Sequence, residues 1–284
     1  MTLTSTVRVQ ELEVPRFLYG TAWKEDRTAP LVDDALAAGF RGVDTANQRK
    51  HYNEAAAGET VKRWLSDGRV PREDLFIQTK YTYVEGQDSR LPYDPAADHA
   101  TQVRQSFESS LLHFGVERID SFLLHGPQMR RGLSEADLEV WTAMEGLRRE
   151  GLVRLIGVSN VTADQLELLC RTAEIPPAFV QNRCYARAGW DREVREVCVR
   201  RNVVYQGFSL LTANVAELSS PEVRSIAKRR SMTIPQVAFR FALQLGMVCL
   251  TGTTDSTHMR EDLAVLESEN LDDEEVLTIE GISG

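Results

Sequence analysis

The chain has 284 residues, of which 42% are hydrophobic and 26% are charged, and this is the composition of an ordinary globular protein. Its formal net charge of −9 argues against nucleic acid as a partner and against a basic membrane-binding patch. No apolar run is long enough to span a bilayer and residues 1–15 lack the apolar core of a secretory signal, so we expect a cytoplasmic protein.

Short apolar runs alternate with longer amphipathic stretches along the chain. In chain order we predict a strand at 16–20, a helix at 28–39, a strand at 40–44, a helix at 54–66, a strand at 75–80, a helix at 98–114, a strand at 119–125, a helix at 134–150, a strand at 153–159, a helix at 162–173, and strands at 178–182, 203–208 and 247–252. Gly39 is placed to end the first helix, Ser134 opens a capping box, and Thr162 is an N-cap residue.

A strand followed by a helix, repeated about eight times, predicts a (β/α)8 barrel. A doubly wound open sheet is the alternative, but its dinucleotide fingerprint G-x-G-x-x-G is absent from the sequence. The chain has no long linker and no low-complexity segment, so we expect residues 1–284 to form a single domain. Residues 81–98 follow the third strand as a long inserted loop with no periodicity of their own.

Polar or ionisable residues follow nearly every predicted strand, at the end where barrel enzymes carry their active sites. In strand order from the second, the residues found there are Asp44, Lys80, His125, Ser159 with Asn160, Gln181 with Asn182, Ser209 after the apolar Phe208, and Thr251 to Thr254. A purely structural barrel does not need such a recurrence, so the pattern predicts an enzyme.

Six segments carry a family resemblance: DTANQRKHYNE, IQTK, IDSFLLHG, GLVRLIGVSN, FVQN and TGTTDSTHMRED. They occur in the order typical of the aldo-keto reductases, and the chain resembles that family from Gly20 to about Glu267. The resemblance implies the barrel fold, NADPH as the cofactor with NADH as the alternative, and reduction of an aldehyde or ketone.

The resemblance also implies a proton relay made by Asp44, Tyr52, Lys80 and His125. Hydride transfer to a carbonyl leaves negative charge on the oxygen, which must be stabilised and then protonated. A phenol has a pKa of about 10, and a nearby ammonium group is expected to lower it. A carboxylate holds the ammonium in place, and an imidazole orients the substrate oxygen.

The loop that carries the phenol is longer than in the usual family pattern, because Gln48 to His51 extend it. Counting back from Asn53 puts His51 at the donor position, whereas the chemistry requires a phenol and favours Tyr52. His51 stays open as an alternative donor, or as a pocket residue that assists or replaces His125. Taken alone, Lys80 is typical of a surface lysine and His125 of a core histidine, and the ordered set is what favours catalysis.

On the cofactor side, the resemblance implies that Ser159, Asn160 and Gln181 bind the nicotinamide carboxamide and that Phe208 stacks on its ring. The full set of cofactor residues is Gly20, Thr21, Ser159, Asn160, Gln181, Phe208, Ser209, Gly252, Thr253, His258, Glu261 and Asp262. Gly252, Thr253 and His258 stand where many NADPH-specific relatives have Lys-Ser and Arg. We therefore expect hydroxyl groups, the N-terminus of the following helix and His258 to bind the phosphate, with an affinity that depends on pH.

A small-molecule carbonyl compound is the expected partner, with Trp23, His51, Tyr81, Tyr83 and Tyr93 as its pocket. The given sequence ends with LDDEEVLTIEGISG, so we expect an open pocket that is able to admit a bulky substrate. The residues leave open whether the substrate is an aldehyde or ketone on a secondary metabolite or a small sugar aldehyde. We expect a monomer. We also expect no metal site, because the four cysteines lack the spacing of metal ligands. The alternatives are a nicotinamide-sensing interaction module with vestigial turnover, and a cofactor-free lyase or epimerase.

Overall fold

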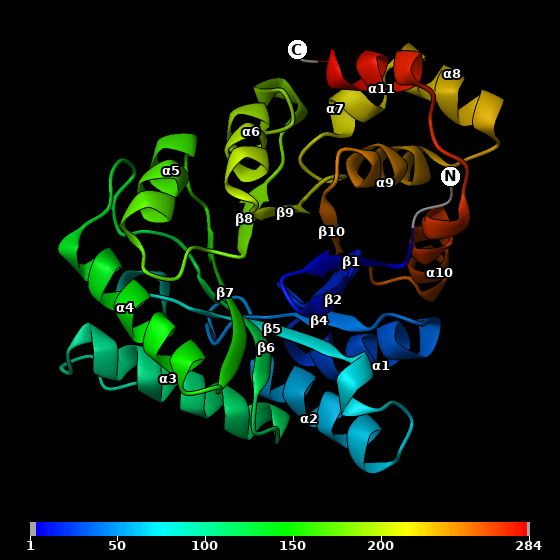
Figure 1. The fold of residues 1–284 in the computed structure, drawn as a ribbon. Coiled ribbons are helices and arrows are strands. Elements are labelled where there is room, and N and C mark those ends of the chain that lie inside the picture. Colours follow the sequence, from blue (N-terminus) through cyan, green and yellow to red (C-terminus); the bar gives the residue numbers. More distant parts are fainter. Residues whose placement is uncertain (1–3, 283–284) are drawn as a thin grey trace.

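Eight parallel strands close into a barrel at the centre of the computed structural model, which describes residues 4–282 (Figure 1). The strands are β3 (Phe17–Gly20), β4 (Gly42–Asp44), β5 (Phe76–Tyr81), β6 (Ile119–Leu124), β7 (Val153–Ser159), β8 (Phe179–Arg183), β9 (Val204–Phe208) and β10 (Val248–Thr251). β10 closes the ring because it pairs with both β3 and β9. The predicted (β/α)8 barrel is confirmed, and the open doubly wound sheet is excluded.

Helices surround the barrel and connect its strands (Figure 1). They are α1 (Thr28–Ala38), α2 (Glu54–Ser66), α3 (His99–Phe114), α4 (Glu135–Arg149), α5 (Ala163–Thr172), α6 (Arg192–Arg201), α7 (Val215–Leu218), α8 (Pro221–Arg230), α9 (Ile234–Gln244), α10 (Ser256–Ala264) and α11 (Asp273–Glu280). Short 3-10 turns lie at Glu25–Arg27, Arg72–Asp74, Val84–Gly86, Ala186–Ala188 and Val265–Glu267. Within residues 4–282, no helix combines the length and the apolar character needed to cross a bilayer.

The helix boundaries follow local sequence signals. Gly39 ends α1 in the left-handed region, with φ of 116°, where a side chain is unfavourable. Ser134 and Asp137 form a reciprocal capping box at the start of α4, and Thr162 with Gln165 does the same for α5. These caps satisfy backbone N–H groups that a helix leaves unpaired in its first turn.

The end of the barrel at which the strands begin, called the lower end below, is apolar and closed. An antiparallel hairpin of β1 (Thr6–Val9) and β2 (Leu12–Pro15), which the sequence analysis missed, packs against this end. Its Val9, Leu12 and Val14 belong to one cluster with inward-facing residues such as Leu155 and Phe179. Burial of these side chains makes the lower barrel a dry core, so a ligand can enter only from the opposite end.

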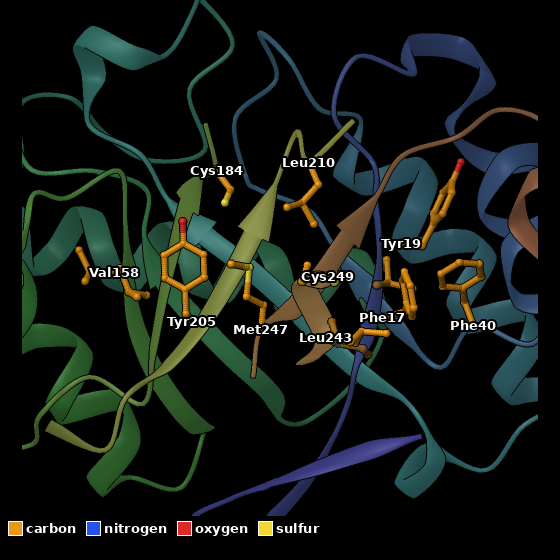
Figure 2. Packing of buried hydrophobic residues seen from close by; sticks show 14 of the residues in the cluster. Phe17, Tyr19, Phe40, Val158, Cys184, Tyr205, Leu210, Leu243, Met247 and Cys249 are labelled. Atoms are coloured by element: carbon orange, nitrogen blue, oxygen red, sulfur yellow. The ribbon is translucent and has the colours of Figure 1, made fainter. Parts of the chain in front are cut away.

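The outer face of the barrel packs against the helices through a second, larger cluster (Figure 2). The ring of Phe17 lies 5.1 Å from that of Phe239 on α9, and the ring of Tyr19 lies 5.7 Å from that of Phe40. Both pairs have the edge-to-face geometry that aromatic rings favour. This layer fixes the helices and leaves the upper strand ends free to carry polar groups.

Candidate active site

A cleft of about 850 Å³ opens at the C-terminal ends of the barrel strands. Among the predicted site residues, those that line it are Gly20, Trp23, Asp44, His51, Tyr52, His125, Ser159, Asn160, Gln181, Phe208, Ser209, Gly252, Thr253, His258, Glu261 and Asp262. A larger groove of about 920 Å³ lies among the loops that precede β5, β6 and β7, at the opposite end, and contains none of these residues. The chemistry-bearing residues therefore select the upper cleft.

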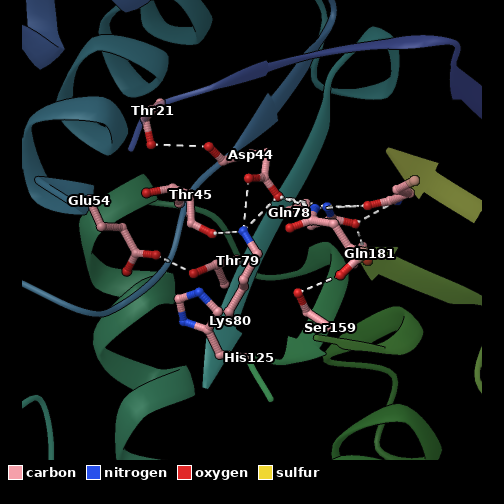
Figure 3. Close-up of polar contacts among 12 residues, drawn as sticks. Thr21, Asp44, Thr45, Glu54, Gln78, Thr79, Lys80, His125, Ser159 and Gln181 are labelled. Carbon is pink, nitrogen blue, oxygen red and sulfur yellow. Dashed lines mark hydrogen bonds and ion pairs between the residues drawn. The ribbon is translucent and has the colours of Figure 1, made fainter. Parts of the chain in front are cut away.

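Lys80 and Asp44 form a buried ion pair beneath the cleft. The Nζ atom of Lys80 donates to both carboxylate oxygens of Asp44 at 2.8 Å, and to the carbonyl oxygen of Thr45 at 2.8 Å (Figure 3). Burial lowers the pKa of Lys80, and the adjacent carboxylate of Asp44 opposes that shift. Lys80 itself is fully buried and acts on the cleft through its neighbours.

Glutamine side chains fill the barrel next to this pair (Figure 3). The Nε2 atoms of Gln78 and Gln181 donate to Oδ1 of Asp44 at 2.7 and 2.9 Å. Both also donate to Oε1 of Gln206, which in turn donates to Gln78. Asp44 thus accepts hydrogen bonds from Lys80, Gln78 and Gln181, and these bonds hold its carboxylate in one geometry.

Tyr52 lies against the two other members of the predicted relay. Its ring centroid is 5.4 Å from Nζ of Lys80, and its ring is 5.8 Å from that of His125. Burial raises the pKa of Tyr52, and the negative charge of Asp44 adds to this effect. The free protein therefore does not show the lowered pKa that the sequence analysis expected from Lys80, and both causes of the shift act in the opposite direction. Tyr52 stays a neutral phenol.

His51 lies at the mouth of the cleft, away from Lys80. Its ring stacks on that of Trp23, with the centroids 4.0 Å apart, and its backbone oxygen accepts a hydrogen bond of 2.7 Å from the Trp23 amide. Trp23 is 67% exposed. Tyr52, not His51, is therefore the residue of this loop that adjoins the ion pair.

His125 follows β6 and faces the same cleft. Its Nδ1 atom lies 2.7 Å from Oγ1 of Thr82, and its backbone oxygen accepts a hydrogen bond of 2.8 Å from Nδ2 of Asn160. Burial lowers the pKa of His125 to about 3, and the positive charge of Lys80 contributes. The imidazole is therefore neutral at physiological pH.

Ser159, Asn160 and Gln181 lie together at the ends of β7 and β8, and their donors are already used. The Ser159 hydroxyl donates to the Gln181 backbone oxygen at 2.6 Å. Nδ2 of Asn160 donates to His125 and to Ser159, and Nε2 of Gln181 donates to Asp44 and Gln206. Within residues 4–282, Oδ1 of Asn160 and Oε1 of Gln181 accept no hydrogen bond. The group therefore offers acceptors to a ligand.

Phe208 and Ser209 end β9 at the side of the cleft. The guanidinium carbon of Arg183 lies 5.6 Å from the Phe208 ring centroid, at a cation–π distance. Arg183 lines the cleft and was missed by the sequence analysis. Its position, two residues after Gln181 on the same strand, was the available signal, because side chains on a strand alternate in direction.

The far side of the cleft joins the ends of β3 and β10. Lys24, also missed by the sequence analysis, lines it and donates from Nζ to the backbone oxygen of Gly252. Burial lowers the pKa of Lys24, and Arg27 adds to the effect. Asp262 accepts a hydrogen bond of 2.7 Å from Thr251, and burial raises its pKa to about 6.

The N-terminus of α10 is not the free donor group that the sequence suggested. The carboxylate of Asp255 accepts hydrogen bonds from the amides of Thr257 and His258, at 2.7 and 3.2 Å. Two of the amides in the first turn are therefore occupied, because an N-cap residue takes the donors that an anion would use. The side chain of His258 still lines the cleft.

Thr21 and the loop tyrosines lie outside the cleft, contrary to expectation. Thr21 is buried, and its hydroxyl donates to the backbone oxygen of Asp44 at 3.0 Å. Tyr81, Tyr83 and Tyr93 are buried and pack on one another, with ring centroids 5.3 and 5.6 Å apart. Their hydroxyls bond to protein groups, so they anchor the loop over the helices instead of forming a pocket wall.

Comparisons with known proteins match nearly the whole chain to one family. The model of the aldo/keto reductase family matches residues 18–283. An uncharacterized oxidoreductase of Bacillus subtilis is 28% identical and covers 93% of this chain and 87% of its own. Deoxymugineic acid synthase 1 of Oryza sativa subsp. japonica is 31% identical and covers 95% and 86%. The crystal structure of an aldo-keto reductase from a Medee basin deep-sea metagenome library aligns with a TM-score of 0.83 at 25% identity, over 98% of this chain and 95% of that one.

Proposed function

Because the chain belongs to the aldo/keto reductase family and is an oxidoreductase of carbonyl compounds, we propose that it reduces an aldehyde or ketone to the alcohol with NADPH. The observation that carries the proposal is that Tyr52 and His125 line one cleft and that Tyr52 adjoins the buried Lys80. The ring centroid of Tyr52 lies 5.4 Å from Nζ of Lys80, and its ring lies 5.8 Å from that of His125. This arrangement supports an acid and a neutral hydrogen-bonding group at the carbonyl oxygen, with a buried cation next to the acid.

Tyr52 is the proposed acid. Its pKa is raised by burial, so it carries its proton when the substrate arrives and gives it to the oxygen as negative charge develops. The phenolate that remains is stabilised by the charge of Lys80, which Asp44 holds in place. His125 donates a hydrogen bond from its neutral ring to the same oxygen and so orients the substrate.

The residues at the ends of β7, β8 and β9 fit a nicotinamide ring. Oδ1 of Asn160 and Oε1 of Gln181 can accept from the carboxamide NH2 group, since their own donors are taken. The Phe208 face can stack on the ring. The cofactor supplies the hydride when bound, and these side chains hold its reactive face toward Tyr52.

NADPH is preferred over NADH in this proposal because a lysine and an imidazole line the opposite side of the cleft. They are Lys24, beside Gly252, and His258 on α10. An additional phosphate gains from the ammonium charge of Lys24 and from a hydrogen bond to the imidazole, whereas a ribose hydroxyl gains little. Asp255 caps the helix and weakens the contribution of its N-terminus, so the side chains carry the selectivity.

The substrate enters beside the stacked rings of Trp23 and His51 at the mouth. An exposed indole with an imidazole behind it offers a flat apolar face. The cleft volume of about 850 Å³ leaves room for a cofactor headgroup and a bulky carbonyl compound. The proposal therefore includes substrates larger than a simple aldehyde.

Cofactor binding is tested by fluorescence titration with NADPH and, separately, NADH. We expect saturable quenching of Trp23, because it is 67% exposed at the cleft mouth, and no quenching of Trp190, which is buried against Phe241. The Trp23→Phe variant is the control, and it should lose most of the signal while calorimetry still detects binding. Absence of binding by both nucleotides would refute the proposal.

Turnover is tested with Tyr52→Phe against the matched control Tyr205→Phe, which removes a buried phenol oxygen that bonds to Asp191 outside the cleft. We expect kcat to fall about 100-fold or more in Tyr52→Phe, with cofactor affinity retained. Tyr205→Phe should keep kcat within about twofold while losing some thermal stability. Equal kcat in both variants would remove Tyr52 as the acid, and cofactor binding without turnover of any carbonyl would favour the sensing module.

A further inference from the structure

The imidazole of His125 is held by a single side chain, Thr82. Oγ1 of Thr82 lies 2.7 Å from Nδ1 of His125, and Thr82 is only 6% exposed. Within residues 4–282, Nε2 of His125 has no hydrogen-bond partner. One ring nitrogen is therefore occupied by a hydroxyl, and Nε2 is the nitrogen left for a ligand in the cleft.

A neutral imidazole carries its proton on one nitrogen only, and the two forms differ in what they offer the cleft. With the proton on Nε2, the ring donates to a carbonyl oxygen. With the proton on Nδ1, Nε2 presents a lone pair, which repels that oxygen. Orientation of a carbonyl substrate therefore requires the first form.

The hydroxyl of Thr82 distinguishes between these forms. Among the described residues its only hydrogen-bond partner is Nδ1 of His125. If the ring carried its proton on Nδ1, the ring would donate to Oγ1, and the hydroxyl proton would be left unpaired in a buried position. If the ring carries its proton on Nε2, the hydroxyl donates to Nδ1 and both groups are satisfied. An unpaired buried donor is unfavourable, so the second arrangement prevails.

We propose that Thr82 is a positioning residue whose hydroxyl donates to Nδ1 of His125 and so holds the imidazole proton on Nε2, toward the substrate oxygen. The inference rests on the proposed carbonyl reduction for its consequence, but not for the tautomer itself. It adds a residue to the relay that lies two positions after Lys80 and does not line the cleft.

The inserted loop keeps this hydroxyl in place. The backbone oxygen of Thr82 accepts hydrogen bonds from the Tyr93 hydroxyl at 2.7 Å and from Nε2 of Gln87 at 3.3 Å. A Cβ atom at Gly86 would lie 2.7 Å from Cγ2 of Thr82, so the methyl group packs directly on this glycine. The two bonds hold the backbone of Thr82, and the methyl contact restricts rotation of its side chain. The buried Tyr93 thus supports Thr82 and does not line the cleft.

The test is the tautomer of His125, read by long-range proton–nitrogen NMR of full-length protein with ¹⁵N-labelled histidine. The His125 signals are those missing from His125→Asn. We expect the Nε2–H form in the wild type and in Thr82→Ser, and an Nδ1–H form or a mixture in Thr82→Val. The matched control Thr60→Val removes another buried hydroxyl, on α2, and should leave the tautomer unchanged.

The kinetic arm uses the same variants. We expect kcat of Thr82→Val to fall about tenfold, equivalent to about 1.4 kcal/mol, with the Kd for NADPH unchanged and with recovery in Thr82→Ser. A wild-type ring protonated on Nδ1 overturns the inference without any variant. So does an unchanged tautomer in Thr82→Val, or an equal loss of kcat in the valine and serine variants. If the wild type reduces no carbonyl, the proposed function fails, while the NMR result still decides the role of Thr82.

Discussion

Nζ of Lys80 donates three hydrogen bonds, to the two carboxylate oxygens of Asp44 and to the backbone oxygen of Thr45, each at 2.8 Å. No hydrogen-bond donor of Lys80 is therefore left for Tyr52, whose ring centroid lies 5.4 Å away. The cation acts on the phenol through its charge alone. Because burial raises the pKa of Tyr52, its hydroxyl stays protonated in the free protein. The charge of Lys80 stabilises the phenolate only after the proton has left.

The first prediction concerns the stability of this pair. Asp44→Ala leaves the buried ammonium of Lys80 without a counter-ion, and we expect it to lower the free energy of unfolding by about 3–5 kcal/mol. Lys80→Met should cost less, because Gln78 and Gln181 still donate to Asp44. Urea unfolding of both variants and of the double variant measures this. A double variant less stable than Asp44→Ala would contradict it, since removing both charges should restore part of the loss.

The second prediction concerns the pH dependence of reduction. An acid works while it is protonated, so a raised pKa at Tyr52 retains activity as the pH rises. His125 has a pKa lowered to about 3, so it also keeps one protonation state. We expect kcat for reduction to be nearly constant from about pH 6 to 9. Single-turnover rates at saturating NADPH measure it, and a fall centred below pH 9 would show that Lys80 dominates after all.

The barrel could be predicted from the sequence because its strands are buried on both faces. Every residue of β5 and β6 is buried, and both strands are rich in apolar residues, although β5 carries Gln78 and Lys80 and β6 carries Asp120. The hairpin β1–β2 was missed because its short strands alternate polar and apolar residues next to the chain start. Its pairing depends on contacts with the barrel that lie far away in sequence.

The candidate site was predictable where a side chain follows a strand directly, as Asp44 and Ser159 do. It was not predictable where the path of a loop decides. Tyr52 reaches the ion pair because the backbone turns at Gln48, whose oxygen accepts from the amides of both His51 and Tyr52. The spacing of residues along the chain does not reveal that turn. It also does not reveal that the loop tyrosines pack around Thr82.

The third prediction concerns Lys24, which lines the cofactor side of the cleft together with His258. If Lys24 binds the phosphate that distinguishes NADPH from NADH, Lys24→Met should weaken NADPH by about tenfold and NADH by less than about twofold. If it binds the shared pyrophosphate, both affinities fall equally. Titration calorimetry with the two nucleotides decides this, with His258→Asn measured in parallel. The conservative variant Lys24→Arg should retain part of the selectivity, whereas equal NADPH affinity in wild type and Lys24→Met would remove Lys24 from the site.

The fourth prediction uses two carboxylates at α10 whose pKa values shift in opposite directions. Burial raises the pKa of Asp262 to about 6, from an ordinary value of 3.8. Its contribution to stability is therefore complete below 3.8 and is lost as the pH rises through 6. The pKa of Asp255 is lowered, chiefly by the amide of His258, so its contribution is present above its ordinary pKa and is lost in acid.

The differences between wild type and each asparagine variant should therefore have opposite slopes. Relative to Asp262→Asn, which mimics the protonated acid, the wild type should lose stability between about pH 4 and 7 and then level off. Relative to Asp255→Asn, it should lose stability only as the pH falls below about 4. Urea unfolding across this range measures both, and each variant is the control for the other because they share one helix. If the two stability differences changed with pH in the same direction, burial would not raise the pKa of Asp262. Asp262 would then be negatively charged in the cleft at pH 5.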